Sequence, residues 1–291
     1  MTAKILDGKA LAKNLRARLV EEREALNEQG VVPRITAVLV TGDDASSYYV
    51  KSQASAAKKI GIEYDLIELP GDVSEQDLTD QITSLNNDDS VTGMILLVPL
   101  PDHLNDSKFQ RMISPKKDVE GIHVQNLGEL VCGGDDLVPC TARAAVEMLL
   151  DSEVEIEGKK AVVVGRSTIV GKPLSMMMLN RNATVTICHS RTKDLPSICA
   201  EADILLCAVG AKAGMINAEW VKPGAIVVDI AIISKPEGGI TGDVDFESVS
   251  EVAGAISPVP GGVGPVTSVM LMRNAIVAAK LQAAASVALN K

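Results

Sequence analysis

Aromatic side chains are scarce in this chain of 291 residues, which contains one Trp, three Tyr and two Phe. So few rings exclude a base-stacking surface of the kind that binds single-stranded nucleic acid. Positively charged residues are also fewer than negatively charged ones: the chain has 28 Lys and Arg and 38 Asp and Glu, and its net charge is −10. Since binding to nucleic-acid phosphates needs a basic stripe, we expect no nucleic-acid partner.

Long apolar runs and paired cysteines are missing too. No uncharged run approaches the roughly 20 apolar residues that span a bilayer, and charged residues interrupt the start of the chain where a signal peptide would need an apolar core. The five cysteines form no C-x-x-C pair and the three histidines are scattered, which argues against a disulfide framework and against a metal site. These absences predict a cytoplasmic protein with buried free thiols and without a membrane partner.

Hydrophobic residues make up 46% of the chain, enough for a sizeable core in one large domain or two ordinary ones. Strand-like and helix-like stretches alternate, which predicts an α/β fold of parallel strands joined by right-handed crossovers. We expect strands over 35–40, 63–69, 94–98, 160–165, 183–188, 203–208 and 225–230, and helices over 8–27, 46–60, 74–86, 140–150, 171–181 and 265–289. A polar loop before residue 141 marks a domain boundary, and we expect the last helix to return to the first domain.

The strongest chemical signal follows the strand predicted at 160–165. A run of valines leads into Gly165, and Gly171 opens a helix six residues later, while Ser167 stands where the second glycine of a G-x-G-x-x-G loop would be. A glycine turn that leads into a helix N-terminus favours an anionic phosphate. An ordinary strand-to-helix turn would show the same pattern, but nucleotide binding is the favoured interpretation.

The end of the next predicted strand points to the kind of nucleotide. An NAD enzyme usually places an acidic residue there to bind the ribose hydroxyls. This chain instead has His189, Ser190 and Arg191, and Arg166 lies in the preceding loop. The serine and the two arginines are suited to a 2′-phosphate, which favours NADP over NAD. His189 alone is better explained by capping or packing than by catalysis.

A second conspicuous segment, residues 257–265, contains three prolines and three glycines and cannot form a helix or a central strand. It is interpreted as a rigid loop before the last helix. The chemistry leaves two roles open for it, a simple connector or a backbone wall that a substrate ring approaches closely.

Together these segments resemble one family, the bifunctional methylenetetrahydrofolate dehydrogenase/cyclohydrolases. The matching stretches are GRSTIVGKP at 165–173, ATVTICHSRT at 183–192, PVPGGVGP at 258–265, PLP at 99–101, KDVEG at 117–121 and PCT at 139–141. The resemblance implies two α/β domains with a cleft between them, and a homodimer. Residues 1–140 with the helix 266–291 would bind folate, and residues 141–265 would form a Rossmann-like domain that binds NADP. Many members oxidise methylenetetrahydrofolate and then hydrolyse the methenyl product.

The resemblance also implies site residues. Those expected to bind the cofactor are Gly165, Arg166, Ser167, Ile169, Gly171, Ser190, Arg191 and Ile232. Those expected to bind the substrate are Tyr49, Pro260, Gly261 and Gly262. The catalytic positions correspond to Tyr49, Gln53, Leu97 and Glu120, and no metal is expected.

Three catalytic positions depart from the family. Gln53 replaces a lysine, Leu97 replaces the glutamine that partners this lysine, and Glu120 replaces an aspartate. Hydride transfer needs no catalytic base, whereas attack of water on the methenyl carbon needs proton transfer, for which the lysine is suited. The sequence therefore predicts an NADP-dependent dehydrogenase whose cyclohydrolase activity is lost or strongly reduced.

Two alternatives remain open. The substitutions on the substrate side would also fit a relative that acts on another one-carbon carrier or a different small substrate. A non-catalytic, nucleotide-binding regulatory protein is the alternative from another class, although both ligand loops look maintained.

Overall fold

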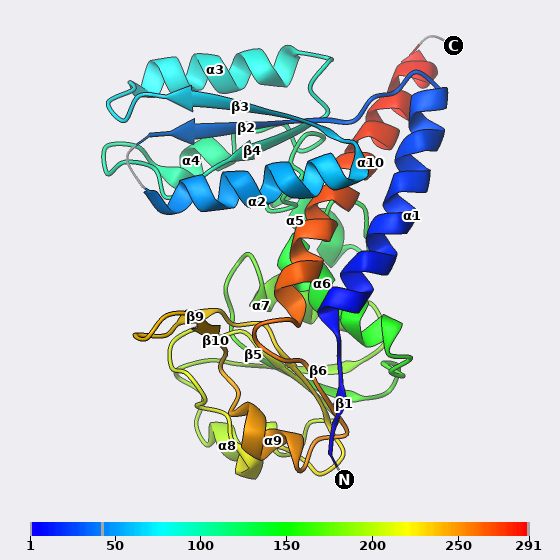
Figure 1. Ribbon diagram of the computed structural model, residues 1–291, viewed down its shortest axis with the longest axis vertical. Helices are drawn as coiled ribbons and strands as arrows, with labels where there is room; N and C mark the ends of the chain where they lie inside the picture. The colour runs from blue at the N-terminus through cyan, green and yellow to red at the C-terminus, as the bar shows by residue number, and fades with distance from the viewer. Residues whose placement is uncertain (1, 42–43, 290–291) are drawn as a thin grey trace. The chain divides into compact units, whose positions relative to one another are not determined.

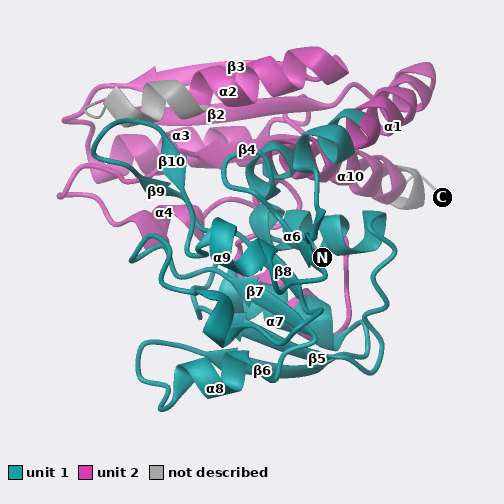
Figure 2. Ribbon diagram, turned by 60° about the horizontal axis from the view of Figure 1, so that its bottom comes forward, with its two compact units in different colours: residues 1–13, 139–267 teal, residues 14–138, 268–291 magenta. Residues whose placement is uncertain are grey.

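The computed structural model describes residues 2–41 and 44–289, with the side chains of 44–49 and 287–289 left undescribed. The chain divides into two compact units (Figure 2). Unit 1 consists of residues 1–13 and 139–267, and unit 2 consists of residues 14–138 and 268–291. Within the described residues, no helix is both long enough and apolar enough to cross a membrane.

Unit 2 is built on a parallel sheet of three strands in the order β3-β2-β4, with α2 and α3 on opposite faces (Figure 1). Its main elements are β2 (Arg34–Val40), α2 (Asp44–Ile60), β3 (Glu63–Leu69), α3 (Glu75–Asn87), β4 (Gly93–Leu96), α4 (Asp106–Gln110) and α5 (Val124–Val131). The helices α1 (Gly8–Glu28) and α10 (Val263–Leu289) contribute residues to both units.

The local sequence explains these elements. All of β2 after Arg34 is buried, as its continuous apolar run predicts for a central strand. The Ser74 hydroxyl accepts a hydrogen bond from the Asp77 amide at 3.1 Å and so caps the N-terminus of α3. At the other end of α3, the buried Lys117 ammonium donates to the carbonyl oxygens of Leu85 and Asp88 at 2.9 and 2.7 Å. The segment that leads to Glu120 is therefore attached to the end of a helix.

Unit 1 contains a parallel sheet of six strands in the order β1-β11-β8-β7-β5-β6. Its elements are β1 (Lys4–Ile5), α6 (Cys140–Asp151), β5 (Lys160–Val164), α7 (Gly171–Leu179), β6 (Thr184–Cys188), α8 (Leu195–Cys199), β7 (Ile204–Cys207), the 3₁₀ turn η1 (Ala218–Trp220), β8 (Ile226–Asp229), β9 (Ile233–Ser234), β10 (Ile240–Thr241), α9 (Phe246–Ser250) and β11 (Ala255–Ile256). Because β5 pairs with β6 on one side and β7 on the other, the strand order reverses there. Ligands of open α/β sheets bind at the carboxyl ends of the strands around such a reversal.

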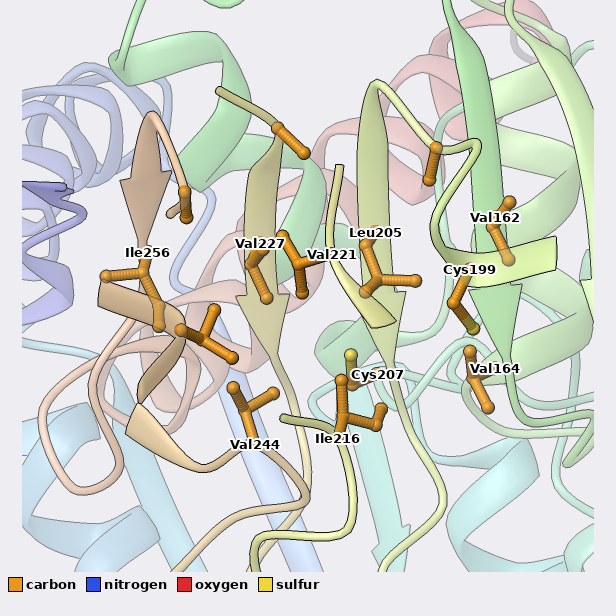
Figure 3. Packing of buried hydrophobic residues seen from close by; sticks show 14 of the residues in the cluster. Val162, Val164, Cys199, Leu205, Cys207, Ile216, Val221, Val227, Val244 and Ile256 are labelled. Atoms are coloured by element: carbon orange, nitrogen blue, oxygen red, sulfur yellow. The ribbon is translucent and has the colours of Figure 1, made fainter. Parts of the chain in front are cut away.

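Small β-branched and aliphatic side chains fill the core of unit 1 on one face of this sheet. Figure 3 shows Val162, Leu205, Val227 and Ile256 on four neighbouring strands, with Cys199 of α8 beside Val162. The buried members of this cluster include no aromatic ring, and the partly buried Trp220 packs against them.

The predicted parallel α/β architecture is confirmed, and β3 has the predicted bounds. Most other bounds differ from the predicted ones by one or two residues, and the short elements β1, β9, β10, β11, α4, α5, α8 and α9 were not predicted. Two further details differ from the sequence predictions. Residues 1–13 belong to unit 1 rather than to the domain of residues 1–140, because β1 pairs with β11. Four cysteines are buried free thiols as predicted, but Cys132 is exposed at the C-terminal end of α5.

Candidate functional site

The turn between β5 and α7 has a shape that only glycine permits at two positions. Gly165 has φ 134°, and a Cβ there would lie 2.3 Å from the carbonyl oxygen of Ala208. A Cβ on Gly171 would lie 2.3 Å from the carbonyl oxygen of Gly165. The loops after β5 and β7 and the first turn of α7 therefore pack backbone against backbone. This packing holds the turn at the carboxyl end of β5, where phosphate binding is expected.

Ser167 determines the path of this turn. Its hydroxyl accepts hydrogen bonds from the amides of Val170 and Gly171 at 3.1 and 3.3 Å. A side chain at the second glycine position of the G-x-G-x-x-G pattern thus replaces glycine flexibility with a side-chain cap. The exposed turn remains open to an anionic ligand.

Positive charge lies at the ends of both neighbouring strands. Arg166 follows β5 and Arg191 follows β6, both are exposed, and neither forms an ion pair with a described residue. The exposed Ser190 stands beside Arg191. Cationic groups and a hydroxyl donor are suited to binding a 2′-phosphate, and these three residues supply both.

His189 has a local structural role in this loop. Its Nδ1 atom accepts from the Arg191 amide at 3.1 Å, and its own amide donates to the Thr192 hydroxyl at 2.9 Å. The prediction that His189 serves in capping is therefore confirmed.

Two apolar side chains are exposed near the strand ends. Ile169, in the turn after β5, is 53% exposed, and Ile232, three residues after β8, is 61% exposed. Single exposed aliphatic residues are common on folded chains, and these two are distinguished by their place after the strand ends, where they are suited to covering the faces of a flat ring.

Two buried carboxyl groups, which the sequence analysis did not select, fix the neighbouring loops. Asp243 accepts from the amides of Val209 and Gly210 at 2.7 and 2.9 Å, immediately after β7. Asp229 accepts from the amides of Asp243 and Val244 at 3.1 and 2.9 Å, and burial raises its pKa to about 6. An Asp that ends an otherwise apolar strand was the signal that could have identified this scaffold.

The loop at residues 257–262 is anchored to the same strand end. The Ser257 hydroxyl accepts from the Asp229 amide at 2.8 Å, and the Gly262 amide donates to the Pro258 carbonyl at 2.8 Å. Pro260 is exposed and Gly261 is partly exposed, whereas Gly262 is buried. The loop is fixed by hydrogen bonds, as a rigid wall requires, and its accessible part is at Pro260 and Gly261.

Unit 2 holds the four positions that the resemblance marks as catalytic. Tyr49 lies on α2, but its side chain is outside the described part of the chain. Gln53 lies one turn further along α2, and its Oε1 atom accepts a hydrogen bond from the Tyr64 hydroxyl at 2.9 Å. Leu97 directly follows β4, and its side chain is buried while its amide donates to the Val38 carbonyl.

Glu120 has an unusual electrostatic environment. Burial and the nearby Asp118 raise the pKa of the Glu120 carboxyl to about 8. Asp118 is itself held by hydrogen bonds from the amides of Gly121 and His123 at 3.1 and 2.7 Å. Burial, together with the charge of Glu120, raises the pKa of Tyr64 to about 12.

Gln53, Tyr64 and Glu120 therefore belong to one cluster, in which Tyr64 is linked to both other residues. Tyr64 was missed by the sequence analysis. Its side chain emerges from a strand of ordinary alternation, so no local pattern distinguishes it, and only the packing of α2 on β3 reveals its contact with Gln53.

Comparison with known proteins also divides the chain near residue 139. Residues 6–120 match the sequence model of the "tetrahydrofolate dehydrogenase/cyclohydrolase, catalytic domain", and residues 139–283 match that of the "tetrahydrofolate dehydrogenase/cyclohydrolase, NAD(P)-binding domain". The chain belongs to this family.

Relatives of the tetrahydrofolate dehydrogenase/cyclohydrolase family match over nearly their whole length. The bifunctional protein FolD of Staphylococcus haemolyticus is 46% identical over 97% of this chain and 99% of its own. The crystal structure of the bifunctional enzyme FolD from Campylobacter jejuni has a TM-score of 0.93 and 40% identity, covering 96% of this chain and 99% of its own. The Trypanosoma brucei enzyme, solved with NADP cofactor and inhibitor, has a TM-score of 0.89 and 34% identity over 97% and 99%. Family membership and the two-domain α/β fold predicted from the sequence are confirmed.

Proposed function

We propose that this protein oxidises methylenetetrahydrofolate to methenyltetrahydrofolate with NADP, and that its cyclohydrolase activity is lost or strongly reduced. The observation that carries the proposal is the environment of Gln53. Where the resemblance implies a lysine, this chain has an amide whose oxygen is bound by the Tyr64 hydroxyl. The dehydrogenase half of the proposal is supported by the family and by the turn at Gly165.

The residues of unit 1 fit a phosphorylated dinucleotide. The turn from Gly165 to Gly171 and the N-terminus of α7 suit a pyrophosphate, and Arg166, Ser190 and Arg191 suit a 2′-phosphate. Bound NADP would supply the hydride acceptor. The chain's own part in this step is to hold the donor carbon of the substrate against the nicotinamide ring, since no proton has to leave a side chain during hydride transfer.

Hydrolysis of the methenyl product makes a further demand on the protein. Water must lose a proton as it attacks, and a lysine with a lowered pKa is suited to that transfer. The Gln53 amide does not titrate, and the buried Leu97 side chain has no polar atom. Removal of one general acid or base typically slows a reaction by about 10² to 10⁴ fold.

Nearby lysines do not restore the missing group. Lys51 precedes Gln53 by two residues and Lys58 follows it by five, and both side chains are exposed. On a helix these offsets direct the side chains away from the face that Gln53 occupies.

The proposal extends to a homodimer in the cytoplasm. Buried free thiols at Cys140, Cys188, Cys199 and Cys207 support a reducing compartment.

The deciding experiment measures both activities on one purified sample. NADP reduction on addition of methylenetetrahydrofolate is followed by absorbance, and decay of added methenyltetrahydrofolate is compared with its decay in buffer. We expect NADP reduction, accumulation of the methenyl compound and little enzyme-dependent decay. Hydrolysis at a rate matching the dehydrogenase would contradict the loss of cyclohydrolase.

Restoring the two residues provides the positive counterpart. Gln53→Lys with Leu97→Gln should raise the rate of methenyltetrahydrofolate hydrolysis. Ser52→Lys is the matched control, because it adds a lysine at an exposed neighbouring position of α2. A comparable increase in both variants would show that added positive charge, rather than position 53, is responsible.

The substitution at Glu120 favours one second candidate, oxidation of a different one-carbon carrier. The side chain is one methylene longer than aspartate. Because its pKa is raised, the carboxyl can keep its proton and donate a hydrogen bond to a ligand, which a carboxylate cannot do. NADP binding without turnover of methylenetetrahydrofolate would favour this candidate or a non-catalytic role.

A further inference from the structure

Tyr64 has the environment of a site residue, although no sequence motif includes it. Its hydroxyl donates to Gln53 Oε1 at 2.9 Å, and Glu120, once ionised, helps to raise the pKa of this hydroxyl. It lies on β3, while Gln53 lies on α2 and Glu120 in the segment after β4, so residues from two other parts of unit 2 act on its hydroxyl.

The hydrogen bond determines how the Gln53 amide is oriented. A glutamine side chain has an acceptor oxygen on one side and a donor NH₂ group on the other. With the oxygen bound by Tyr64, the Nε2 group is directed away from the ring. No residue among those whose side chains are described accepts a hydrogen bond from Nε2. The site thus presents a neutral donor at the position where a lysine would present a charged one.

The tyrosine is suited to holding the amide in this orientation. Its pKa is raised to about 12 by burial and by Glu120, so the hydroxyl keeps its proton throughout the physiological pH range. A hydroxyl that stays protonated remains available as a donor, and the amide oxygen remains its acceptor. The same pKa argues against Tyr64 as a replacement for the missing proton-transfer group.

We propose that Tyr64 is a positioning residue that fixes the Gln53 amide with Nε2 as a hydrogen-bond donor to the tetrahydrofolate substrate. This inference rests on the function proposed above and identifies the residue through which Gln53 acts. Without the hydroxyl, the amide can turn over and present its oxygen to the same ligand atom. A misplaced acceptor weakens ligand binding and leaves the chemistry of hydride transfer unaltered.

A double-mutant cycle of Tyr64→Phe and Gln53→Ala tests the proposal. Phenylalanine keeps the ring and removes only the hydroxyl. The KM and kcat for methylenetetrahydrofolate are measured together with the dissociation constant of tetrahydrofolate, which binds but cannot donate the hydride. We expect Tyr64→Phe to raise the KM and this dissociation constant roughly threefold to tenfold, as for loss of one neutral hydrogen bond. The kcat and the KM for NADP should change little.

The second arm of the cycle separates positioning from a general loss of structure. In the Gln53→Ala background, Tyr64→Phe should have no further effect on tetrahydrofolate binding, because its partner is gone. Thr92→Val is the control. It removes a hydroxyl that donates to the Arg34 carbonyl at 2.9 Å in the same sheet, and it should lower Tm without changing the KM.

Each outcome decides one question. Unchanged tetrahydrofolate binding in Tyr64→Phe, or an equal effect in both backgrounds, overturns the role of Tyr64. If the wild-type protein binds tetrahydrofolate but does not oxidise the methylene compound, the proposed function fails, while the cycle on the dissociation constant still tests the positioning role. A wild-type protein that does not bind tetrahydrofolate overturns both proposals.

Discussion

The carbonyl oxygen of Ala208 occupies the space that a side chain on Gly165 would need, since a Cβ there would approach it to 2.3 Å. Gly165 also has φ 134°, where side chains are strained. We therefore expect Gly165→Ala to lower the free energy of unfolding by at least about 2 kcal/mol and to weaken NADP binding. Urea unfolding and titration with NADP measure the two effects.

Gly128→Ala is the matched control for this prediction. Gly128 lies within α5 and a Cβ there would meet nothing within 4 Å, so alanine should stabilise the protein by about 0.5 to 1 kcal/mol. Equal stabilities of the wild type and Gly165→Ala would contradict the required backbone contact between the two loops.

The choice between NADP and NAD should depend on Arg191. This exposed guanidinium forms no ion pair with a described residue, so it is available to a 2′-phosphate. Arg191→Ala should raise the KM for NADP by about 10-fold to 100-fold, as for loss of a charge-assisted hydrogen bond, and should leave the KM for NAD unchanged. Lys193→Ala removes a positive charge from the same exposed loop and should have a small effect. Equal changes for both nucleotides would argue against phosphate recognition.

Glu120 should make stability fall as pH rises. Its pKa is raised from 4.5 to about 8, so between these values the folded protein keeps a proton that the unfolded chain releases. Its stabilising contribution is complete below the unfolded pKa and is lost as pH rises through the folded pKa. Glutamine mimics the protonated form, so Glu120→Gln should become increasingly stable relative to the wild type from about pH 5 to about pH 8.5.

Thermal unfolding across that pH range measures the difference between the two proteins. Glu68→Gln, at an exposed position of β3, provides the matched control and should follow the wild type. A constant difference in Tm between Glu120→Gln and the wild type would show that Glu120 ionises normally in the folded state.

Asn274 ties the last helix to the segment that carries Glu120. Its side-chain Nδ2 atom donates to the carbonyl oxygens of Val119 and Val138, both at 2.9 Å, and it is only 1% exposed. Asn274→Ala leaves buried carbonyls without this donor and should lower the free energy of unfolding by about 2 to 4 kcal/mol. Lys280→Ala removes an exposed ion pair to Glu22 from the same helix and should cost about 1 kcal/mol or less. Chemical denaturation of both variants tests the contrast.

Long, strongly patterned elements were predictable from the sequence. The strand at β2 is a run of buried β-branched and aliphatic residues, and Gly61 closes α2 before β3 begins. Ser74 marks the start of α3 by a cap whose hydrogen bond the structure contains. In these places local propensity and tertiary packing favour the same structure.

Short strands and contacts between elements were not predictable. β1 and β11 are two residues each, too short for any periodic pattern, and they form because the sheet of unit 1 provides hydrogen-bond partners. The contact of Tyr64 with Gln53 depends on how α2 packs on β3, which neither element encodes alone. The motif at Gly165 indicated a nucleotide turn. The support that Asp243 gives to the loop after β7 was not predictable, because Asp243 lies 34 residues beyond Val209, from whose amide it accepts a hydrogen bond.

The pairing of β1 with β11 has a consequence for how the protein is made. Residues 4–5 are synthesised long before their strand partners at 255–256, so the sheet of unit 1 stays incomplete until those partners have left the ribosome. Unit 2 likewise stays incomplete until residues 268–291 have emerged. Contacts between segments so far apart in the sequence form late in folding. A nascent chain that stops before the last helix would lose part of both units at once.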